Sequence, residues 1–220
     1  MWSPQVARLA DAHRVVVLDL PGHGELAAEP FTLDAAADSV ARAIDEAAEG
    51  RAVVVGLSLG GYVGIHLAER SPDRVRGLVL AGASAEPAGV RAAPYRALAM
   101  AMDTLDGHGL EALNRWFFRT RFPPAIAEPI VAGGFWPTGG AAALRSLAGH
   151  RFLPALAAYP GPTLILNGEL DVPFRLGQRD FAHAARHGRI VRLQGATHLS
   201  NLDRPAAFSE AVRRFVAGLD

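Results

Sequence analysis

The sequence predicts an α/β fold in which a mostly parallel sheet is covered by helices on both faces. Short β-branched apolar runs alternate with longer alanine-rich segments. The alternation stops once, at 86–159, where aromatic residues and prolines replace strand-like runs. A chain of 220 residues is long enough for one such core with an insertion. We therefore predict a core formed by 1–85 and 160–220, interrupted by a helical cap at 86–159.

The individual elements follow from their apolar patterns and from the residues that end them. The predicted strands are 14–20, 52–55, 75–81, 163–166 and 189–193. The predicted core helices are 32–49, 59–70 and 203–217. Thr32 or Asp34 is expected to cap the first of these helices, and Asp203 the last, with Pro205 in its first turn.

The stretch Gly56–Gly60 reads Gly-Leu-Ser-Leu-Gly and lies between a predicted strand and a predicted helix. This context is typical of a nucleophile elbow, in which a serine occupies a strained turn with its hydroxyl exposed. Glycines on either side let neighbouring backbone come close. Ser58 is therefore the candidate nucleophile. The alternative interpretation of these residues is an ordinary turn of small side chains.

A nucleophilic serine needs a base, and the base needs an orienting acid, in the chain order Ser, acid, His. Glu169 and Asp171 follow the predicted strand 163–166, and His198 follows the strand 189–193. Carboxyl ends of parallel strands meet at one sheet edge, so these side chains are expected near Ser58. Asp171 is preferred as the acid because it lies further into its loop, although the triad rule allows either carboxylate.

The histidines other than His198 are not spaced like the ligands of a metal site. We predict neither a metal nor a cofactor. No H-E-x-x-H motif and no paired carboxylates accompany them. The turn residue His23 is a candidate support for the pocket floor, and His66 is interpreted as a packing residue. The others are interpreted as solvated or packing: His13, His108, His150, His183 and His187. The absence of cysteine excludes disulfides, thiolate catalysis and Cys-ligated metals.

Composition narrows the expected partners and compartment. Lys+Arg and Asp+Glu both number 22, and no basic patch stands out, so nucleic-acid binding is not expected. No apolar run has the length of a membrane span, and the N-terminus lacks signal-peptide features. We expect a cytoplasmic protein that acts on a small molecule without membrane or nucleic acid. The sequence leaves its oligomeric state open.

The aromatic residues of the insertion are candidates for lining an apolar pocket above the strand ends. The candidate substrate contacts are Trp116, Phe117, Phe135 and Trp136. The competing interpretation is that these aromatics, with Phe118, form the core of a helical subdomain. Arg115, Arg119 and Arg121 are candidates for binding a substrate carboxylate, against the more common role of solvated surface charge.

Together these motifs resemble the α/β-hydrolase fold superfamily, in its branch of cap-bearing esterases and lactonases similar to 3-oxoadipate enol-lactonases. The matching stretches are 15–25, 53–83, 162–173 and 195–215. The resemblance implies Ser58 as nucleophile, Asp171 as acid, His198 as base and the Leu59 N–H as an oxyanion donor. It implies hydrolysis of a small carboxylic ester or lactone through an acyl-enzyme. A non-catalytic small-molecule receptor, carbon–carbon bond hydrolysis and perhydrolysis remain alternatives.

One departure from this family concerns the N-terminal end. Relatives have strands before the position of Trp2, and the last of them supplies a second oxyanion N–H and lies between the strands 14–20 and 52–55. Either the natural protein is longer, which we expect, or the sheet closes up or is completed by a partner. Loss of one oxyanion donor costs on the order of 10²–10³ in rate. We therefore expect the 220-residue chain to be inactive or nearly inactive.

Overall fold

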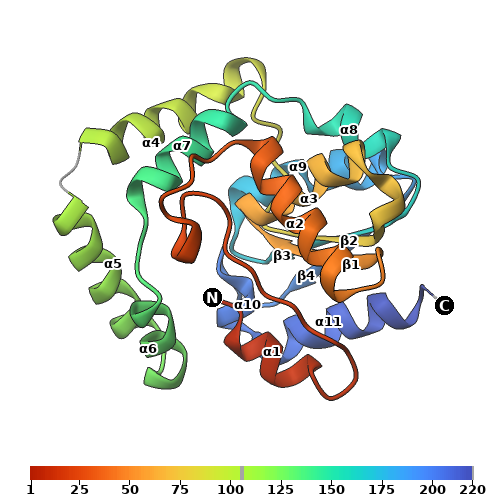
Figure 1. Ribbon diagram of the computed structural model, residues 1–220, viewed down its shortest axis with the longest axis horizontal. Helices are drawn as coiled ribbons and strands as arrows, with labels where there is room; N and C mark the ends of the chain where they lie inside the picture. Colours follow the sequence, from red (N-terminus) through yellow and green to blue (C-terminus); the bar gives the residue numbers. More distant parts are fainter. Residues whose placement is uncertain (105–106, 220) are drawn as a thin grey trace.

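The computed structural model describes residues 1–104 and 107–219, so positions 105, 106 and 220 of the predicted ranges lie outside the described residues. A parallel four-stranded sheet forms its centre, in the order β1-β2-β3-β4 (Figure 1). The strands are β1 (Ala52–Leu57), β2 (Val75–Ala81), β3 (Pro162–Gly168) and β4 (His187–Leu193). Leu80 is paired with Gly56 on one side and with Ile165 on the other. The four corresponding strand predictions are confirmed.

The helices follow the predicted alternation. Before β2 lie α1 (Ser3–Leu9), α2 (Leu33–Ala47) and α3 (Leu59–Arg70). Between β2 and β3 lie α4 (Ala93–Thr104), α5 (Gly107–Arg121), α6 (Pro124–Ala132), α7 (Pro137–Leu147) and α8 (Phe152–Ala158). The last three are α9 (Val172–Ala184), α10 (Ser200–Asp203) and α11 (Pro205–Ala217). Among the described residues, no helix is both long enough and apolar enough to span a bilayer.

Successive residues of β2 point into two different cores, because side chains alternate across a strand. Leu78 and Leu80 are fully buried among side chains of α2, α3, α8 and α9. Val79 and Ala81 are fully buried on the other face, against α1 and α11. Figure 1 shows these two helical layers above and below the sheet. The predicted arrangement of helices on both faces is confirmed.

The predicted strand 14–20 is wrong: this segment runs past the sheet as an irregular stretch without a ladder (Figure 1). Val16 and Val17 are 47% and 51% exposed. Among the described strands, β1 pairs only with β2 and is an edge of the sheet. A β-branched run favours a pleated, half-buried surface, but a strand also needs a hydrogen-bonding neighbour. The apolar pattern of 14–20 could not reveal that the described sheet offers this segment no neighbouring strand.

The two cap predictions had different outcomes. Thr32 caps α2, because its Oγ1 accepts a hydrogen bond from Ala35 N at 3.0 Å. Asp203 does not cap the closing helix, which begins at Pro205 after Arg204. Its carboxylate instead accepts from the backbone N and the hydroxyl of Thr197, at 2.7 and 2.6 Å. A nearby loop therefore takes the capping carboxylate away from the helix.

The helices between β2 and β3 divide by what they contact. Helix α8 packs on α3, where the Phe152 and Tyr62 ring centroids lie 4.7 Å apart. Just after α8, the Tyr159 hydroxyl donates to the Val75 carbonyl at 3.0 Å, and burial raises the pKa of Tyr159 to about 12. Helices α5 and α6 instead build a separate apolar cluster around Phe118. Figure 1 shows α4 to α6 projecting from the sheet and its helical layers.

Candidate active site

Ser58 occupies a strained turn between β1 and α3. Its backbone has φ 51° and ψ −116°, a region that non-glycine residues rarely adopt. A Cβ on Gly56 would lie 2.2 Å from the Gly60 carbonyl carbon, so the turn needs glycine at 56. The Cβ direction of Gly60 itself is open, with no atom within 4 Å. The tight approach predicted for this motif therefore depends on Gly56 rather than on the second glycine.

His198 and Asp171 form a hydrogen-bonded pair at the ends of neighbouring strands. The His198 Nδ1 lies 2.9 Å from Asp171 Oδ2. Only 4% of the Asp171 side chain is exposed, against 36% for His198. A carboxylate partner keeps the proton on Nδ1, so Nε2 is left with a lone pair. His198 Nε2 is thus able to accept a proton.

Glu169, the competing acid, has a different partner. Its carboxylate accepts a hydrogen bond from Gly195 N at 2.8 Å. Of the two carboxylates, it is Asp171 that bonds the imidazole, as the sequence analysis favoured. Glu169 and Asp203 instead hold the two sides of the loop that carries His198, through Gly195 and Thr197 respectively. These carboxylates have a positioning effect that the sequence analysis missed.

The backbone at Ala81–Gly82 connects the serine to the histidine. Ser58 N donates to the Ala81 carbonyl at 2.7 Å, which fixes the elbow against the end of β2. The next residue, Gly82, has φ 53°, and a Cβ on it would lie 2.8 Å from His198 Cε1. The Ser58 backbone and the His198–Asp171 pair therefore both lie beside Ala81–Gly82, at the carboxyl edge of the sheet. The sequence feature that could have predicted the contact with His198 is Gly82, which directly follows the apolar run 75–81.

The buried side-chain amide of Asn167 supports the residues that contact the His198 imidazole. Asn167, at the end of β3, is fully buried and accepts from Gly82 N at 3.1 Å. Its Nδ2 donates to Ser84 Oγ at 2.9 Å, and that hydroxyl donates to the Phe174 carbonyl at 2.8 Å. The Phe174 ring stacks on His198, with centroids 4.7 Å apart and planes at 24°. No role was predicted from the sequence for Asn167, Ser84 or Phe174.

The predicted substrate-contacting aromatics differ in exposure. Phe135 is stacked on Phe118, with ring centroids 5.6 Å apart, and belongs to the packed cluster of α5 and α6. Trp116, Phe117 and Trp136 are 63%, 40% and 39% exposed. The structure thus places Phe135 in the core that the competing interpretation expected. The other three side chains remain accessible to a ligand.

The remaining candidate residues also have defined surroundings. Leu59 is the first residue of α3, so its N–H has no intrahelical acceptor. His23 turns its Nδ1 toward the Pro21 carbonyl at 3.0 Å. The three candidate arginines all form ion pairs within the protein: Arg115 with Glu111, Arg119 with Glu128 and Arg121 with Asp203. A substrate carboxylate would therefore have to compete with these partners.

A parallel sheet with a strained serine after β1 and a histidine–carboxylate pair after β3 and β4 is typical of hydrolases. The alpha/beta hydrolase family model matches residues 1–211, and the chain belongs to that family. This confirms the family resemblance inferred from the motifs.

Named proteins and a solved structure agree with this assignment. A pimeloyl-(acyl-carrier protein) methyl ester esterase of Neisseria meningitidis is 30% identical over 233 residues, covering 100% of this chain and 89% of the relative. The 3-oxoadipate enol-lactonase 2 of Acinetobacter baylyi is 27% identical, covering 96% and 82%. The enol-lactonase structure from Burkholderia xenovorans superposes with a TM-score of 0.81 at 27% identity, covering 98% and 85%.

Proposed function

We propose that this protein hydrolyses a small carboxylic ester or lactone, with Ser58 as nucleophile, His198 as base and Asp171 as orienting acid. The observation that carries the proposal is the 2.9 Å pair between His198 Nδ1 and Asp171 Oδ2. This pair stands beside the same backbone segment that anchors the Ser58 elbow. The names of the esterase and lactonase relatives support the same reaction class.

The reaction follows from the protonation states that this geometry favours. The Ser58 hydroxyl attacks the substrate carbonyl carbon while the lone pair on His198 Nε2 takes its proton. Buried Asp171 stabilises the imidazolium, and the Leu59 N–H donates to the tetrahedral oxyanion. Collapse of the intermediate transfers the proton to the leaving alkoxide and leaves an acylated Ser58. A water molecule deprotonated by His198 then releases the acid and restores the serine.

The helices between β2 and β3 are the proposed source of substrate selectivity. We assign 86–159 as a cap over the strand ends, with α8 serving as its packed base on α3. The exposed rings of Trp116, Phe117 and Trp136 would contact an apolar acyl or alcohol group. Phe135 would act indirectly, by holding the cluster from which the exposed rings project.

The test combines turnover with covalent labelling. Hydrolysis of p-nitrophenyl acetate and butyrate would be measured for the wild type, Ser58→Ala and the matched control Ser146→Ala on α7. A fluorophosphonate probe followed by intact mass and peptide mapping reports the nucleophile even where turnover is slow. We expect one label on Ser58 in the wild type and in Ser146→Ala, and neither label nor turnover in Ser58→Ala. Labelling of another residue, or a folded wild type that neither reacts nor hydrolyses, would overturn the proposal.

A further inference from the structure

His66 on α3 has a well-defined partner on one ring nitrogen and none on the other. Its Nε2 lies 2.8 Å from Asp34 Oδ1 of α2, so Nε2 carries the proton and Nδ1 keeps a lone pair. The residue is only 9% exposed, and the buried Nδ1 has no hydrogen-bond partner. A buried polar atom without a partner is uncommon and costs free energy. Packing, the role expected for His66, does not account for this free nitrogen.

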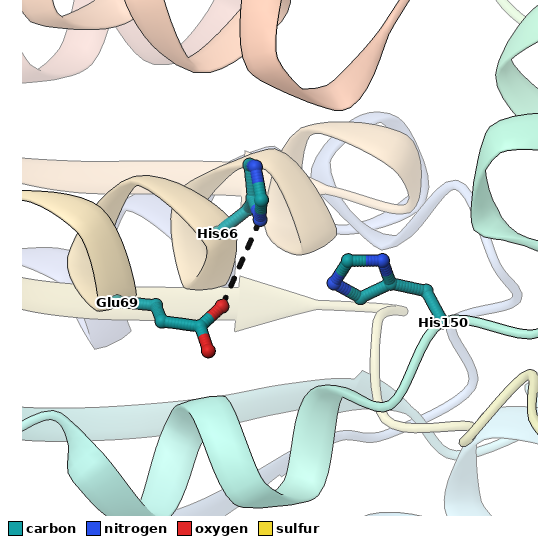
Figure 2. Close-up of side chains that lie close together, drawn as sticks. All are labelled: His66, Glu69 and His150. Carbon is teal, nitrogen blue, oxygen red and sulfur yellow. Dashed lines mark ion pairs between the residues drawn. The ribbon is translucent and has the colours of Figure 1, made fainter.

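Two further ligand-type side chains face the free nitrogen (Figure 2). Glu69, one turn further along α3, brings its Oε2 to 3.8 Å from His66 Nδ1. His150 arrives from the connection between α7 and α8, with its ring centroid 5.4 Å from that of His66. One ligand atom from each of the three residues lies within 4.8 Å of the others. The sequence did not reveal this group, because His150 is distant along the chain from the other two.

We propose that His66 Nδ1, the Glu69 carboxylate and the His150 imidazole bind one divalent transition-metal ion of the zinc type. Two imidazoles and one carboxylate suit Zn²⁺ in a tetrahedral site whose fourth position takes water. Asp34 would orient His66 from behind, as carboxylates do for metal-bound histidines. This revises the sequence-based expectation that the protein has no metal site.

The present positions require only a modest closure around the ion. Ligand atoms bound to tetrahedral zinc at about 2.0–2.1 Å lie roughly 3.3 Å from one another, so the widest of the present separations must shorten. The Glu69 side chain is 45% exposed and has room to swing inward. The His150 ring rests against Phe152, with centroids 4.6 Å apart. Burial, followed by the neighbouring His66, lowers the pKa of His150, so the imidazole remains in its neutral, metal-binding form.

The location indicates a structural clamp rather than a second reaction centre. His66 follows Ser58 by two turns of the same helix, about 12 Å along its axis. An ion here would join α3, which begins at the elbow, to the segment that leads out of the proposed cap. The site therefore stabilises the contact between α3 and the connection from α7 to α8, without touching the reacting atoms.

The experiment is a zinc titration of the EDTA-treated, dialysed full chain by isothermal calorimetry, with thermal unfolding followed in parallel. We expect one Zn²⁺ per chain and a higher midpoint with zinc. Glu69→Gln and His150→Gln should each weaken binding at least tenfold, whereas His183→Gln, an exposed histidine on α9, should bind as the wild type does. Asp34→Asn should weaken binding by about 10–100-fold through loss of orientation.

Two further measurements separate this proposal from the esterase proposal. Ser58→Ala should bind zinc like the wild type, and metal-free His150→Gln should keep the ester hydrolysis of the metal-free wild type. Co²⁺ bound at the site should show the visible absorption of a tetrahedral complex, lost in Glu69→Gln. No binding by the folded wild type, or unchanged affinity in both Glu69→Gln and His150→Gln, would overturn the metal site and leave the esterase proposal standing.

Discussion

Gly82 lies against the His198 imidazole so closely that a Cβ on it would be 2.8 Å from Cε1 and 2.9 Å from Nδ1. Its φ of 53° is also unfavourable for alanine. The residue therefore sets how deeply the histidine can sit over the end of β2. Asn167 fixes that backbone by accepting from Gly82 N, so a single glycine links the buried network to the proposed base.

We predict that Gly82→Ala lowers kcat for p-nitrophenyl butyrate by about 10²-fold, because a displacement of ~1 Å of a catalytic group has that effect. The matched control is Gly89→Ala. Gly89 has a similar φ of 60° but no atom within 4 Å of its Cβ direction. Both variants should lose about 1 kcal/mol of stability from left-handed alanine, while only Gly82→Ala should lose activity. Equal loss in both would show that backbone strain, not contact with His198, is responsible.

Mutations of the two carboxylates near His198, Asp171 and Glu169, should have very different effects on kcat. Asp171→Asn leaves the shape intact but favours the wrong imidazole tautomer, and we expect kcat to fall by about 10⁴-fold. Glu169→Gln still offers an oxygen to Gly195 N, so its kcat should fall less than tenfold. Steady-state kinetics on p-nitrophenyl butyrate measures both. A larger loss in Glu169→Gln than in Asp171→Asn would reverse the assignment.

The sequence predicted those parts of the protein in which local pattern and tertiary environment agree. Val75–Ala81 is an apolar run with strands on both sides, and its bounds were predicted as observed. Segment 14–20 has a similar composition but no ladder, because pairing depends on a neighbour that composition does not encode. The predicted cap at Asp203 is wrong for a related reason: Thr197, in the preceding loop, donates to the same carboxylate.

Side chains of the candidate site could likewise be predicted only where a local sequence pattern places them. Ser58, Asp171 and His198 could be named as candidates because each follows a recognisable strand, and the carboxyl ends of parallel strands meet at one edge of the sheet. Asn167, Phe174 and the pair of His66 with His150 depend on contacts between distant segments. No spacing rule applies to them, because their neighbours are set by packing of helices and loops rather than by one element.

The aromatics of α5 should divide into structural and ligand-contacting residues. Phe118 is 7% exposed and stacks with both Phe122 and Phe135, whereas Trp116 is 63% exposed. Phe118→Ala should cost about 3–5 kcal/mol of stability. Trp116→Ala should change stability by less than about 0.5 kcal/mol and raise KM for p-nitrophenyl butyrate severalfold. Urea unfolding and steady-state kinetics test the pair, and an unchanged KM would exclude Trp116 from the substrate path.

The Glu86 side chain, in the loop that follows β2, forms hydrogen bonds to the start of α8. Its Oε2 accepts hydrogen bonds from Phe152 N at 3.0 Å and Leu153 N at 3.2 Å, two of the amides that a helix start leaves unpaired. Glu86→Ala should therefore lower the free energy of unfolding by about 1 kcal/mol at pH 7. Glu86→Gln keeps an acceptor oxygen and should lose less.

The pH dependence of this effect has a definite sign. Burial raises the pKa of Glu86 above 4.5, and the hydrogen bonds from Phe152 and Leu153 only partly oppose it. The folded state therefore takes up the proton at higher pH than the unfolded chain does. The associated stability is fully present below about pH 4.5 and is lost as the pH rises through the folded value. Wild type should thus gain stability relative to Glu86→Gln as the pH falls toward 4.5, as measured by urea unfolding. A loss of relative stability over the same change would mean that the two amide hydrogen bonds outweigh burial.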